Sequence, residues 1–474
     1  MIPMRLSEIA DVVGGDVHGD ETGQVMVTGA AYVDSRTPVP AGLFVAVAGE
    51  HVDGHDYADG AHAVLGSRPT AAPTVVVDDP VAALGRLARH VVDRLDVTVF
   101  AITGSQGKTG TKDYLAGVLR TLAGERAVVA TAANFNNELG VPLTVLRADA
   151  STRHLVVEMG ARGIGHIAHL CRIAPPAVAA VLNVGTAHVG EFGSKENIAR
   201  AKGEIVEALP PGGTAVLNAD DDLVAAMAQR TAAAVLTFGR GRPAAVTGRD
   251  LKVGALGRPT FDLVYGEERH PVALQQSGTH QVGNALAAAA CALAADFALA
   301  DIARALSQVA PASRWRMEVT ERTDGLVLIN DAYNANPESM DAALHALSDI
   351  AAGLATDTPR RTIAVLGPMY ELGEEHDAGH ERVGRIAAGL GVDVLVVVGD
   401  EARGIADGAR AATPTTVSEL IVTPDKAEAA AWLRHNAGGG DVVLVKASRG
   451  AALEWMADQL LAGDGAAEDE ESTR

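Results

Sequence analysis

From about residue 97 the chain alternates short apolar runs with longer segments of helical periodicity. The apolar runs are rich in β-branched residues and show no regular polar alternation, as is typical of strands buried on both faces. The segments between them repeat apolar positions every three to four residues, as helices with one buried face do. This alternation predicts a mostly parallel sheet with helices on both faces. The predicted strands are 97–103, 127–131, 154–160, 177–185, 214–220 and 234–239, and the predicted helices are 109–122, 165–171, 195–209 and 221–230.

A second β/α series begins near Gly325. It repeats the same pattern of buried strands and helices, which predicts a separate doubly wound domain. The predicted strands are 325–331, 361–368, 392–400 and 441–448, and the predicted helices are 337–350, 376–389, 401–411, 425–436 and 450–462.

The first 96 residues have a different composition, mixed and rich in Gly, Pro and Asp, with short strands such as 42–49. A chain of 474 residues is longer than one hydrophobic core usually serves. The last twelve residues lack the apolar surface that offsets ordering entropy, so we expect an acidic disordered tail. The sequence therefore predicts an α/β protein of three domains and a tail, with the ranges 1–96, 97–312, 313–462 and 463–474.

The net charge of -21 argues against a broad nucleic-acid-binding face, which needs clustered Lys and Arg. A local basic site for a small anion remains compatible with that charge. The two cysteines, Cys171 and Cys291, lie in apolar helical contexts and indicate free thiols in a reducing compartment.

No apolar core of a signal peptide is found at the N-terminus. The most apolar run, 284–300, is short, rich in alanine and interrupted by Asp296, which favours a buried helix over a membrane span. We expect a cytoplasmic protein without membrane insertion.

The sharpest local motif is ITGSQGKTGT at 102–111, between a predicted strand and a predicted helix. Backbone N–H groups at such a helix N-terminus bind phosphate oxygens, and Gly104 and Gly107 allow a close approach. Lys108 is placed to bridge the outer phosphates, and Thr109 offers a hydroxyl to Mg²⁺. Ile102 stands where the standard phosphate loop has its first glycine. The loop indicates a nucleoside triphosphate but names no reaction, and a chance Gly-Lys-Thr is the alternative.

Candidate metal ligands stand where two predicted strands end. Glu158 ends one strand, and His188 follows the next. Ligands of open α/β sheets bind beyond the carboxyl ends of the strands, so both side chains are placed to face the same phosphates. Carboxylate and imidazole suit Mg²⁺ with Thr109 as a further ligand. The alternative is a buried ion pair and a loop histidine. Lys202, taken alone, reads as a solvated helix lysine.

Taken together, these motifs resemble the Mur ligase family from about Asp34 to Glu454. The matching blocks of the first two domains are 34–61, 134–146, 158–167, 183–205, 217–222 and 278–290. In the C-terminal half, blocks 330–344, 366–384 and 445–454 resemble the branch that adds D-alanyl-D-alanine to a UDP-linked muramoyl tripeptide.

Several alternatives stay open beside that branch. The nearest is the ligase one step earlier, which adds a single amino acid and carries a different sequence at 331–338. Relatives that build folate polyglutamates or amino-acid polymers lack the block at 34–61. A regulatory or transport ATPase is disfavoured by the UDP-sugar-like first domain. A dinucleotide-binding oxidoreductase is weak, because no G-x-G-x-x-G follows a strand in the C-terminal half.

The resemblance implies a UDP-sugar-binding first domain, a P-loop ATP-binding central domain and a Rossmann-like ligase domain. It implies an ATP-dependent amide-bond ligase of peptidoglycan precursor synthesis that works through an acyl phosphate. The cofactors are ATP, one or two Mg²⁺ ions and a carbamylated Lys202. The substrates are UDP-N-acetylmuramoyl-tripeptide and D-alanyl-D-alanine, with no nucleic-acid partner, and we expect a monomer.

The resemblance also assigns roles to residues. Lys108, His188 and Lys202 are catalytic, and the metal ligands are Thr109, Glu158, His188 and Lys202. Nucleotide-binding residues are Gly104, Ser105, Gln106, Gly107, Lys108, Thr109, Gly110, Asn284, Arg316, Asp331, Asn334 and Asn336. Substrate-binding residues are Ser35, Arg36, Phe44 and Asp53 at the UDP end, Asn134, Asn136 and Asn137 at the muramoyl-peptide, and Arg449 at the dipeptide carboxylate. The chain departs from the family pattern at Gly110, where Ser or Thr is usual, and at Ala447, where Gly is common.

Overall fold

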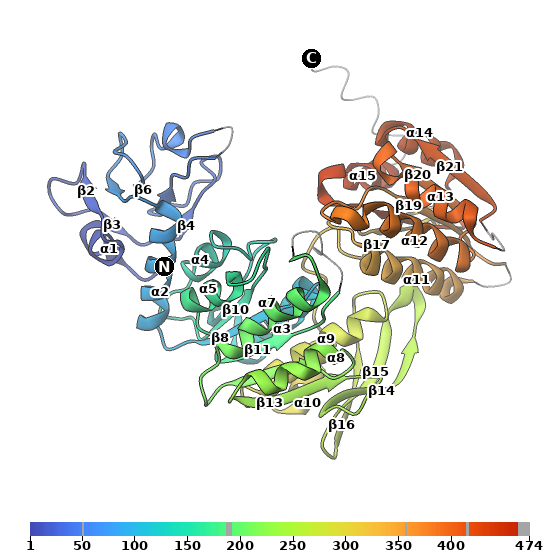
Figure 1. The fold of residues 1–474 in the computed structure, drawn as a ribbon, viewed down its shortest axis with the longest axis horizontal. Coiled ribbons are helices and arrows are strands. Elements are labelled where there is room, and N and C mark those ends of the chain that lie inside the picture. The colour runs from blue at the N-terminus through green and yellow to red at the C-terminus, as the bar shows by residue number, and fades with distance from the viewer. Residues whose placement is uncertain (50–51, 186–191, 356–357, 414–416, 463–474) are drawn as a thin grey trace.

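The computed structural model describes residues 1–49, 52–185, 192–355, 358–413 and 417–462. His188 and the predicted acidic tail lie outside the described residues. The chain forms three α/β bodies in sequence order, with the central body between the N-terminal and C-terminal ones (Figure 1). The predicted boundaries fall between α2 (Pro80–Arg94) and β8 (Thr98–Thr103) and between α10 (Leu299–Leu306) and β17 (Glu318–Glu321), and the limits themselves remain predictions.

The N-terminal body holds a five-stranded sheet of order β2-β7-β6-β5-β4 and a small β1-β3 pair. Strands β4 to β7 run parallel, and β2 is antiparallel to β7. The last helix, α2, packs toward the central body, since a Cβ at Gly85 would lie 3.2 Å from Ile173 of α5. The elements are β1 Met4–Arg5, α1 Leu6–Val13, β2 Asp16–His18, β3 Met26–Val27, β4 Ala31–Tyr32, β5 Leu43–Val45, β6 Ala63–Gly66, β7 Thr74–Val76 and α2 Pro80–Arg94.

The central body is built on a nine-stranded sheet of order β16-β15-β14-β13-β12-β11-β8-β10-β9, counted within the described residues. Strands β8 to β14 are parallel to their neighbours, and β15 and β16 extend the sheet as an antiparallel hairpin. Its strands are β8 Thr98–Thr103, β9 Val128–Ala130, β10 His154–Glu158, β11 Val178–Val181, β12 Thr214–Asn218, β13 Ala234–Gly239, β14 Val246–Val253, β15 Pro259–Tyr265 and β16 Glu268–Ala273. Its helices are α3 Lys108–Ala123, α4 Gly140–Val145, α5 His166–Ile173, α7 Lys195–Glu207, α8 Asp222–Ala225, α9 His280–Leu293 and α10 Leu299–Leu306.

All six strands predicted for this part of the chain are confirmed, with shifts at their ends. The apolar run at 284–300 was predicted as one buried helix, and the structure shortens it. Helix α9 ends at Leu293, because Asp296 adopts a left-handed φ of 64° and α10 starts at Leu299. Among the described helices, none is long and apolar enough to cross a membrane.

The C-terminal body has a six-stranded sheet of order β17-β18-β22-β19-β20-β21 within the described residues. Only β17 runs antiparallel to its neighbour. The last strand in the chain, β22, therefore lies between β18 and β19. Its elements are β17 Glu318–Glu321, β18 Val327–Asn330, α11 Pro337–Leu354, β19 Arg361–Leu366, α12 His376–Gly389, β20 Val394–Val398, α13 Arg403–Ala411, β21 Glu419–Thr423, α14 Lys426–Asn436, β22 Asp441–Lys446 and α15 Glu454–Ala462.

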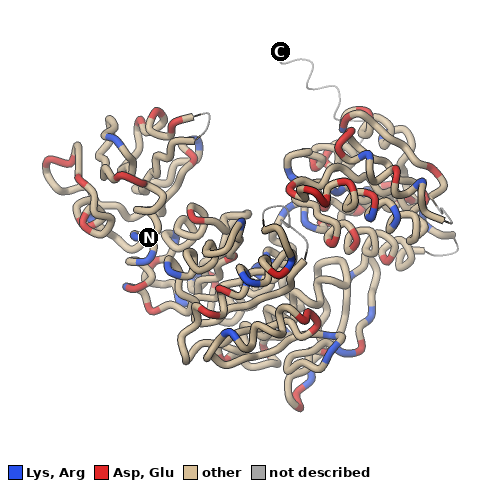
Figure 2. The backbone as a smooth tube through the Cα atoms, in the orientation of Figure 1, with Lys and Arg blue, Asp and Glu red and all other residues tan. Residues whose placement is uncertain are grey.

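Acidic and basic residues are interspersed along the described backbone of all three bodies (Figure 2). The excess of acidic residues is thus not confined to one segment of the described chain. Because parallel strands place their carboxyl ends at one edge, the loops after β8, β10 and β11 gather together, and so do those after β18, β19 and β22. These two sets of loops supply the candidate site.

Candidate active site

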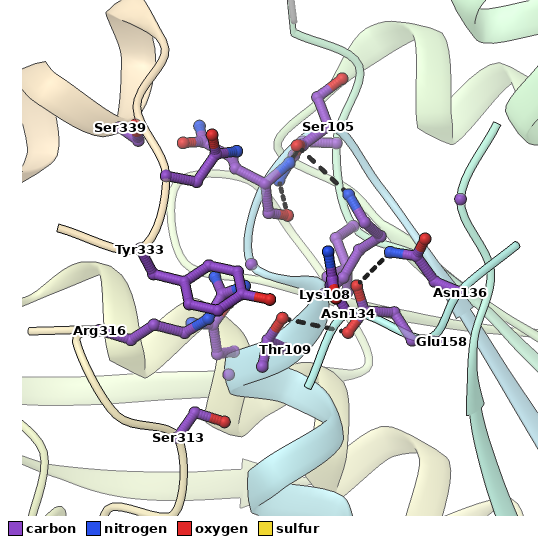
Figure 3. A pocket seen from close by; sticks show the side chains of 18 of the residues that line it. Ser105, Lys108, Thr109, Asn134, Asn136, Glu158, Ser313, Arg316, Tyr333 and Ser339 are labelled. Carbon is purple, nitrogen blue, oxygen red and sulfur yellow. Dashed lines mark hydrogen bonds between the residues drawn. The ribbon is translucent and has the colours of Figure 1, made fainter. Parts of the chain in front are cut away.

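A cavity of about 940 Å³ is lined by both the central and the C-terminal body. Figure 3 shows Lys108, Thr109 and Glu158 from the central body facing Arg316 and Tyr333 from the other. Most of the predicted nucleotide, metal and dipeptide residues meet here. Those that line the cavity are Ser105, Gln106, Gly107, Lys108, Thr109, Gly110, Asn134, Asn136, Asn137, Glu158, Lys202, Asn284, Arg316, Asp331, Asn334, Asn336 and Arg449.

The phosphate-binding loop joins the end of β8 to the start of α3, as the motif predicted. Gly107 adopts φ 81°, and a Cβ there would lie 2.5 Å from Asn284 Oδ1, so only glycine fits. Asn183 clamps the loop, since its Oδ1 accepts from Gln106 N at 3.0 Å and its Nδ2 donates to Gln106 O at 3.1 Å. The backbone amides at the start of α3 are thereby fixed in a position that suits phosphate oxygens.

Lys108 folds back over its own loop, and its Nζ donates to Gly104 O at 2.6 Å. Gly104 thus supports the site without lining the cavity. Burial lowers the pKa of Lys108, the carboxylate of Glu158 raises it, and the positive charge of Arg316 lowers it further. An incoming polyphosphate offers this lysine the anionic partner that carbonyl oxygens cannot.

Thr109 and Glu158 lie side by side, both nearly buried, and Thr109 Oγ1 donates to Glu158 Oε2 at 3.0 Å. The other oxygen, Oε1, accepts from Asn136 Nδ2 at 2.9 Å (Figure 3). A hydroxyl and a carboxylate beside a phosphate loop are the oxygen donors that Mg²⁺ prefers. The residues described here therefore fit a magnesium ion held together with nucleotide phosphates.

Lys202 is not a solvated helix lysine. It projects from α7 into the same cavity and is only 6% exposed. Burial lowers its pKa well below the usual range, and the nearby charge of Lys108 lowers it further. Both effects make Lys202 lose its proton more easily than a solvated lysine does.

Asn284 on α9 lies against the loop from the other side. Its Nδ2 donates to Gln281 Oε1 at 2.9 Å, and its Oδ1 accepts from Thr111 Oγ1 at 3.4 Å. A Cβ at Gly110 would lie 2.7 Å from Asn284 Nδ2. The glycine that departs from the family pattern is thus the residue that leaves room for this asparagine.

Asp331 follows β18 and forms a buried ion pair with Lys446 at the end of β22. Lys446 Nζ lies 2.6 Å from Asp331 Oδ2 and also donates to Asn334 O at 2.8 Å. The second carboxylate oxygen, Oδ1, accepts from Met317 N at 3.0 Å. Lys446 therefore fixes both Asp331 and the loop that carries Asn334.

Two further predicted nucleotide residues hold other parts of this wall. The guanidinium of Arg316 lies 4.1 Å from the ring centroid of Tyr333, so the cation packs against the ring at the cavity wall. Asn336 caps helix α11, because its Oδ1 accepts from Ser339 N at 2.8 Å. Asn336 thus orients α11 as well as lining the cavity.

Arg449, predicted at the dipeptide carboxylate, stacks over the indole of Trp315 at 4.4 Å and pairs with Glu454. The neighbouring departure, Ala447, is fully buried. A Cβ at Gly367 would lie 2.8 Å from the Cβ of Ala447, so glycine at 367 accommodates the extra methyl.

The predicted UDP-end residues do not line this cavity. Arg36 makes three hydrogen bonds to Asp34, two from its guanidinium and one from its backbone N, which hold the pKa of Asp34 at about 2. Ser35 lies between them in the same exposed turn. Asp53 caps a short 3-10 helix, accepting from His55 N at 3.0 Å, and pairs with Arg68. Their contact with UDP stays a prediction.

The placement of Phe44 does not support the role predicted for it. Its side chain is 2% exposed and packs against Tyr32, with ring centroids 5.3 Å apart. Phe44 is thus a core residue of the N-terminal sheet, and a bulky residue on a short strand carries no sequence signal that separates core from ligand contact.

Three residues that shape the site were not among those predicted from the sequence: Lys446, Asn183 and Tyr333. Lys446 acts through Asp331, 115 residues away in sequence. Its position at the carboxyl end of a predicted strand was the one available signal.

Known protein families and relatives match this chain along most of its length. The chain matches the Mur ligase middle domain over residues 102–292 and the Mur ligase glutamate ligase domain over residues 315–449. It is 44% identical, over 509 aligned positions, to the UDP-N-acetylmuramoyl-tripeptide--D-alanyl-D-alanine ligase of Mycobacterium tuberculosis, covering 98% of this chain and 99% of the relative. The enzyme of the same name from Escherichia coli is 34% identical, covering 96% and 97%.

Solved structures agree with these relatives. MurF of Acinetobacter baumannii superposes with a TM-score of 0.84 at 31% identity, covering 97% of this chain and 99% of that one. MurF of Thermotoga maritima, solved in complex with ADP, gives a TM-score of 0.78 at 30% identity, covering 93% and 98%. With both domains matched and relatives aligned along nearly its whole length, the chain belongs to the Mur ligase family.

Proposed function

We propose that this protein joins D-alanyl-D-alanine to UDP-N-acetylmuramoyl-tripeptide at the expense of ATP, in the synthesis of peptidoglycan precursor. One structural observation carries the proposal. The phosphate-binding loop of the central body lines the same cavity as a wall of the C-terminal body that includes Asp331 and Arg449. A nucleotide and a second substrate can therefore share one space. The full-length similarity to relatives named for this reaction supplies the substrates.

The first step activates the peptide carboxylate, because a carboxylate does not react with an amine at neutral pH. One carboxylate oxygen attacks the γ-phosphorus of ATP, the bond to the β-phosphate oxygen breaks, and an acyl phosphate and ADP result. Phosphoryl transfer depends mainly on positioning and charge neutralisation. Lys108 and the amides of residues 105–109 provide both at the phosphates.

In the second step the amine of D-alanyl-D-alanine attacks the acyl carbon. The C–O bond to phosphate then breaks, phosphate leaves, and the amine gives up a proton. In this proposal the amine approaches from the C-terminal wall, where Arg449 is assigned to the dipeptide carboxylate. Closure of the two bodies around the cavity excludes water, which protects the acyl phosphate from hydrolysis.

One or two Mg²⁺ ions belong to this proposal, with Thr109, Glu158, a carbamylated Lys202 and His188 as their protein ligands. Bound Mg²⁺ neutralises phosphate charge and polarises the transferred group. A carbamate forms only from a neutral amine, and the lowered pKa of Lys202 supports that form. The resulting carbamate anion lies near the positive charge of Lys108, which stabilises it.

The remaining substrate contacts are proposals of the same kind. Asn134, Asn136 and Asn137 line the central side of the cavity and offer uncharged hydrogen bonds to the muramoyl-peptide. Ser35, Arg36 and Asp53 are assigned to the UDP end. A cytoplasmic location and a monomeric state complete the proposal. Both cysteines are free and buried, as a reducing compartment allows.

A coupled ADP-release assay tests the function directly. ADP release should require the tripeptide-bearing nucleotide and D-alanyl-D-alanine together. The UDP-muramoyl dipeptide with a single amino acid should not support it. Turnover with that second pair, and none with the first, would assign the chain to the preceding ligase step instead.

A further inference from the structure

Two loops of the C-terminal body are fastened side by side at the cavity. Residues 367–372 follow β19, and residues 447–450 follow β22. Gly367 N donates to Lys446 O at 2.9 Å, and Ser448 N donates to Pro368 O at 2.9 Å. Tyr370 N in turn donates to Ser448 Oγ at 3.0 Å. These bonds fasten the two loops together, and one residue of each loop comes directly after the fastened Tyr370 or Ser448.

Those two residues are Glu371 and Arg449, and both line the cavity. Glu371 adopts a left-handed φ of 64°, which is rare for a residue other than glycine. The turn is held on either side by buried anchors, Met369 at 0% and Leu372 at 2% exposure. Met369 N also donates to the ring Nε2 of His380 at 3.0 Å. Non-glycine residues in this conformation persist where the surroundings over-determine them, often at ligand sites.

A carboxylate and a guanidinium on two joined loops match the two charged ends of a zwitterionic peptide. The two charged ends of an extended dipeptide are about 7 Å apart, within the combined reach of a glutamate and an arginine on neighbouring loops. We propose that Glu371 binds the N-terminal ammonium of the incoming dipeptide while Arg449 binds its carboxylate. The inference rests on the proposed ligase function and names the residue that selects a free amine.

Position, rather than charge alone, points to Glu371. Asp113, Glu138 and Glu158 line the cavity from the central body, not from the wall that carries Arg449. Asp331 shares the C-terminal wall, but it follows β18, on another loop. Glu371 is the cavity-lining acid whose loop is hydrogen-bonded to that of Arg449.

Steady-state kinetics of Glu371→Gln test this assignment, with D-alanyl-D-alanine varied at saturating ATP and UDP-muramoyl-tripeptide. The KM for the dipeptide should rise at least about tenfold, the usual effect of losing a charge-assisted hydrogen bond. The KM for ATP should stay within about twofold. Glu374→Gln is the matched control, because Glu374 is exposed and does not line the cavity.

A second measurement separates ammonium binding from a structural effect on the loop. (R)-2-Hydroxypropanoyl-D-alanine, with a hydroxyl in place of the ammonium, serves as a competitive inhibitor against the dipeptide. Wild-type protein and Glu371→Asp should prefer the dipeptide over this analogue, and Glu371→Gln should lose most of that preference. A distorted loop would weaken both ligands equally.

The outcomes are distinguishable. If Glu371→Gln keeps the wild-type KM for the dipeptide and the wild-type preference over the hydroxy analogue, the inference is wrong and the ligase function stands. If wild-type protein shows no turnover that depends on D-alanyl-D-alanine, the proposed function fails first. Loss of ATP binding together with dipeptide binding in Glu371→Gln would also contradict a role confined to the ammonium.

Discussion

Lys446 Nζ lies 2.6 Å from Asp331 Oδ2, and this ion pair links the ends of two adjacent strands beneath the nucleotide cavity. Breaking such a pair leaves a buried charge without its counter-ion, which usually costs about 3–5 kcal/mol. Lys446→Met should therefore lower the free energy of unfolding by about 3 kcal/mol and raise the KM for ATP. Urea unfolding and ADP-release kinetics measure the two effects.

The double variant Lys446→Met with Asp331→Asn is its control. Removing both charges should restore much of the lost stability but not the ATP affinity, since Asp331 is predicted at the ribose. Full recovery of ATP affinity in the double variant would show that Asp331 has no contact with the nucleotide.

Gly110 offers a test of loop packing. A methyl at this position meets Asn284 Nδ2 at 2.7 Å, so Gly110→Ala should displace the asparagine and raise the KM for ATP about tenfold. Gly389→Ala, at a helix position with nothing within 4 Å of the added Cβ, is the comparison. An unchanged KM for ATP in Gly110→Ala would mean that Asn284 is not held against the nucleotide.

Thr109→Val removes the hydroxyl that donates to Glu158 and keeps the shape of the side chain. The apparent affinity for Mg²⁺ should fall about 10–100-fold, as is common when a group that ligates or orients a metal site is lost. A magnesium titration of ADP release measures this. Thr121→Val on the same helix, where the hydroxyl donates only to Gly117 O, should leave the titration unchanged.

The lowered pKa of Lys202 makes the free energy of unfolding depend on pH. Because the folded-state pKa lies below that of the unfolded chain, the unfolded state holds the proton over the interval between them. In buffer free of carbon dioxide, stability should therefore rise with pH through that interval, and Lys202→Met should lose the rise. The opposite slope, or none, would contradict burial of an unmodified lysine.

The same lysine has a chemical test. Incubation with ¹³C-labelled bicarbonate, ATP and Mg²⁺ should produce a carbamate signal by NMR in wild-type protein and none in Lys202→Met. Wild-type protein that turns over substrate without incorporating label would remove the carbamate from the mechanism.

The sequence predicted the parallel core well, because buried strands such as 98–103 and 154–158 are apolar on both faces and read as continuous runs. It did not predict the extension of the sheet by β14 and by the antiparallel strands β15 and β16. Its solvent-facing positions carry charged residues such as Arg249 and Arg269, so a fully apolar run is absent there. Strand pairing at a sheet edge is decided by contacts between distant segments.

Site residues with a local motif were predictable, and those that act through distant partners were not. Lys108 and Thr109 belong to a recognisable loop between a strand and a helix. Lys446 and Asn183 depend on groups 115 and 77 residues away in sequence. Phe44 was assigned to the UDP end by the family resemblance alone, and its burial in the N-terminal sheet does not support that role.

The identity of the product tests the central claim most directly. Purified protein, UDP-N-acetylmuramoyl-tripeptide, D-alanyl-D-alanine and ATP with Mg²⁺ should yield a nucleotide peptide heavier by one dipeptide less one water, with one ADP for each product. Mass spectrometry reads both species, and Lys108→Ala should form neither. Failure of the wild-type protein to make this product, or full product formation by Lys108→Ala, would contradict a ligase that phosphorylates its carboxylate substrate at the 104–109 loop.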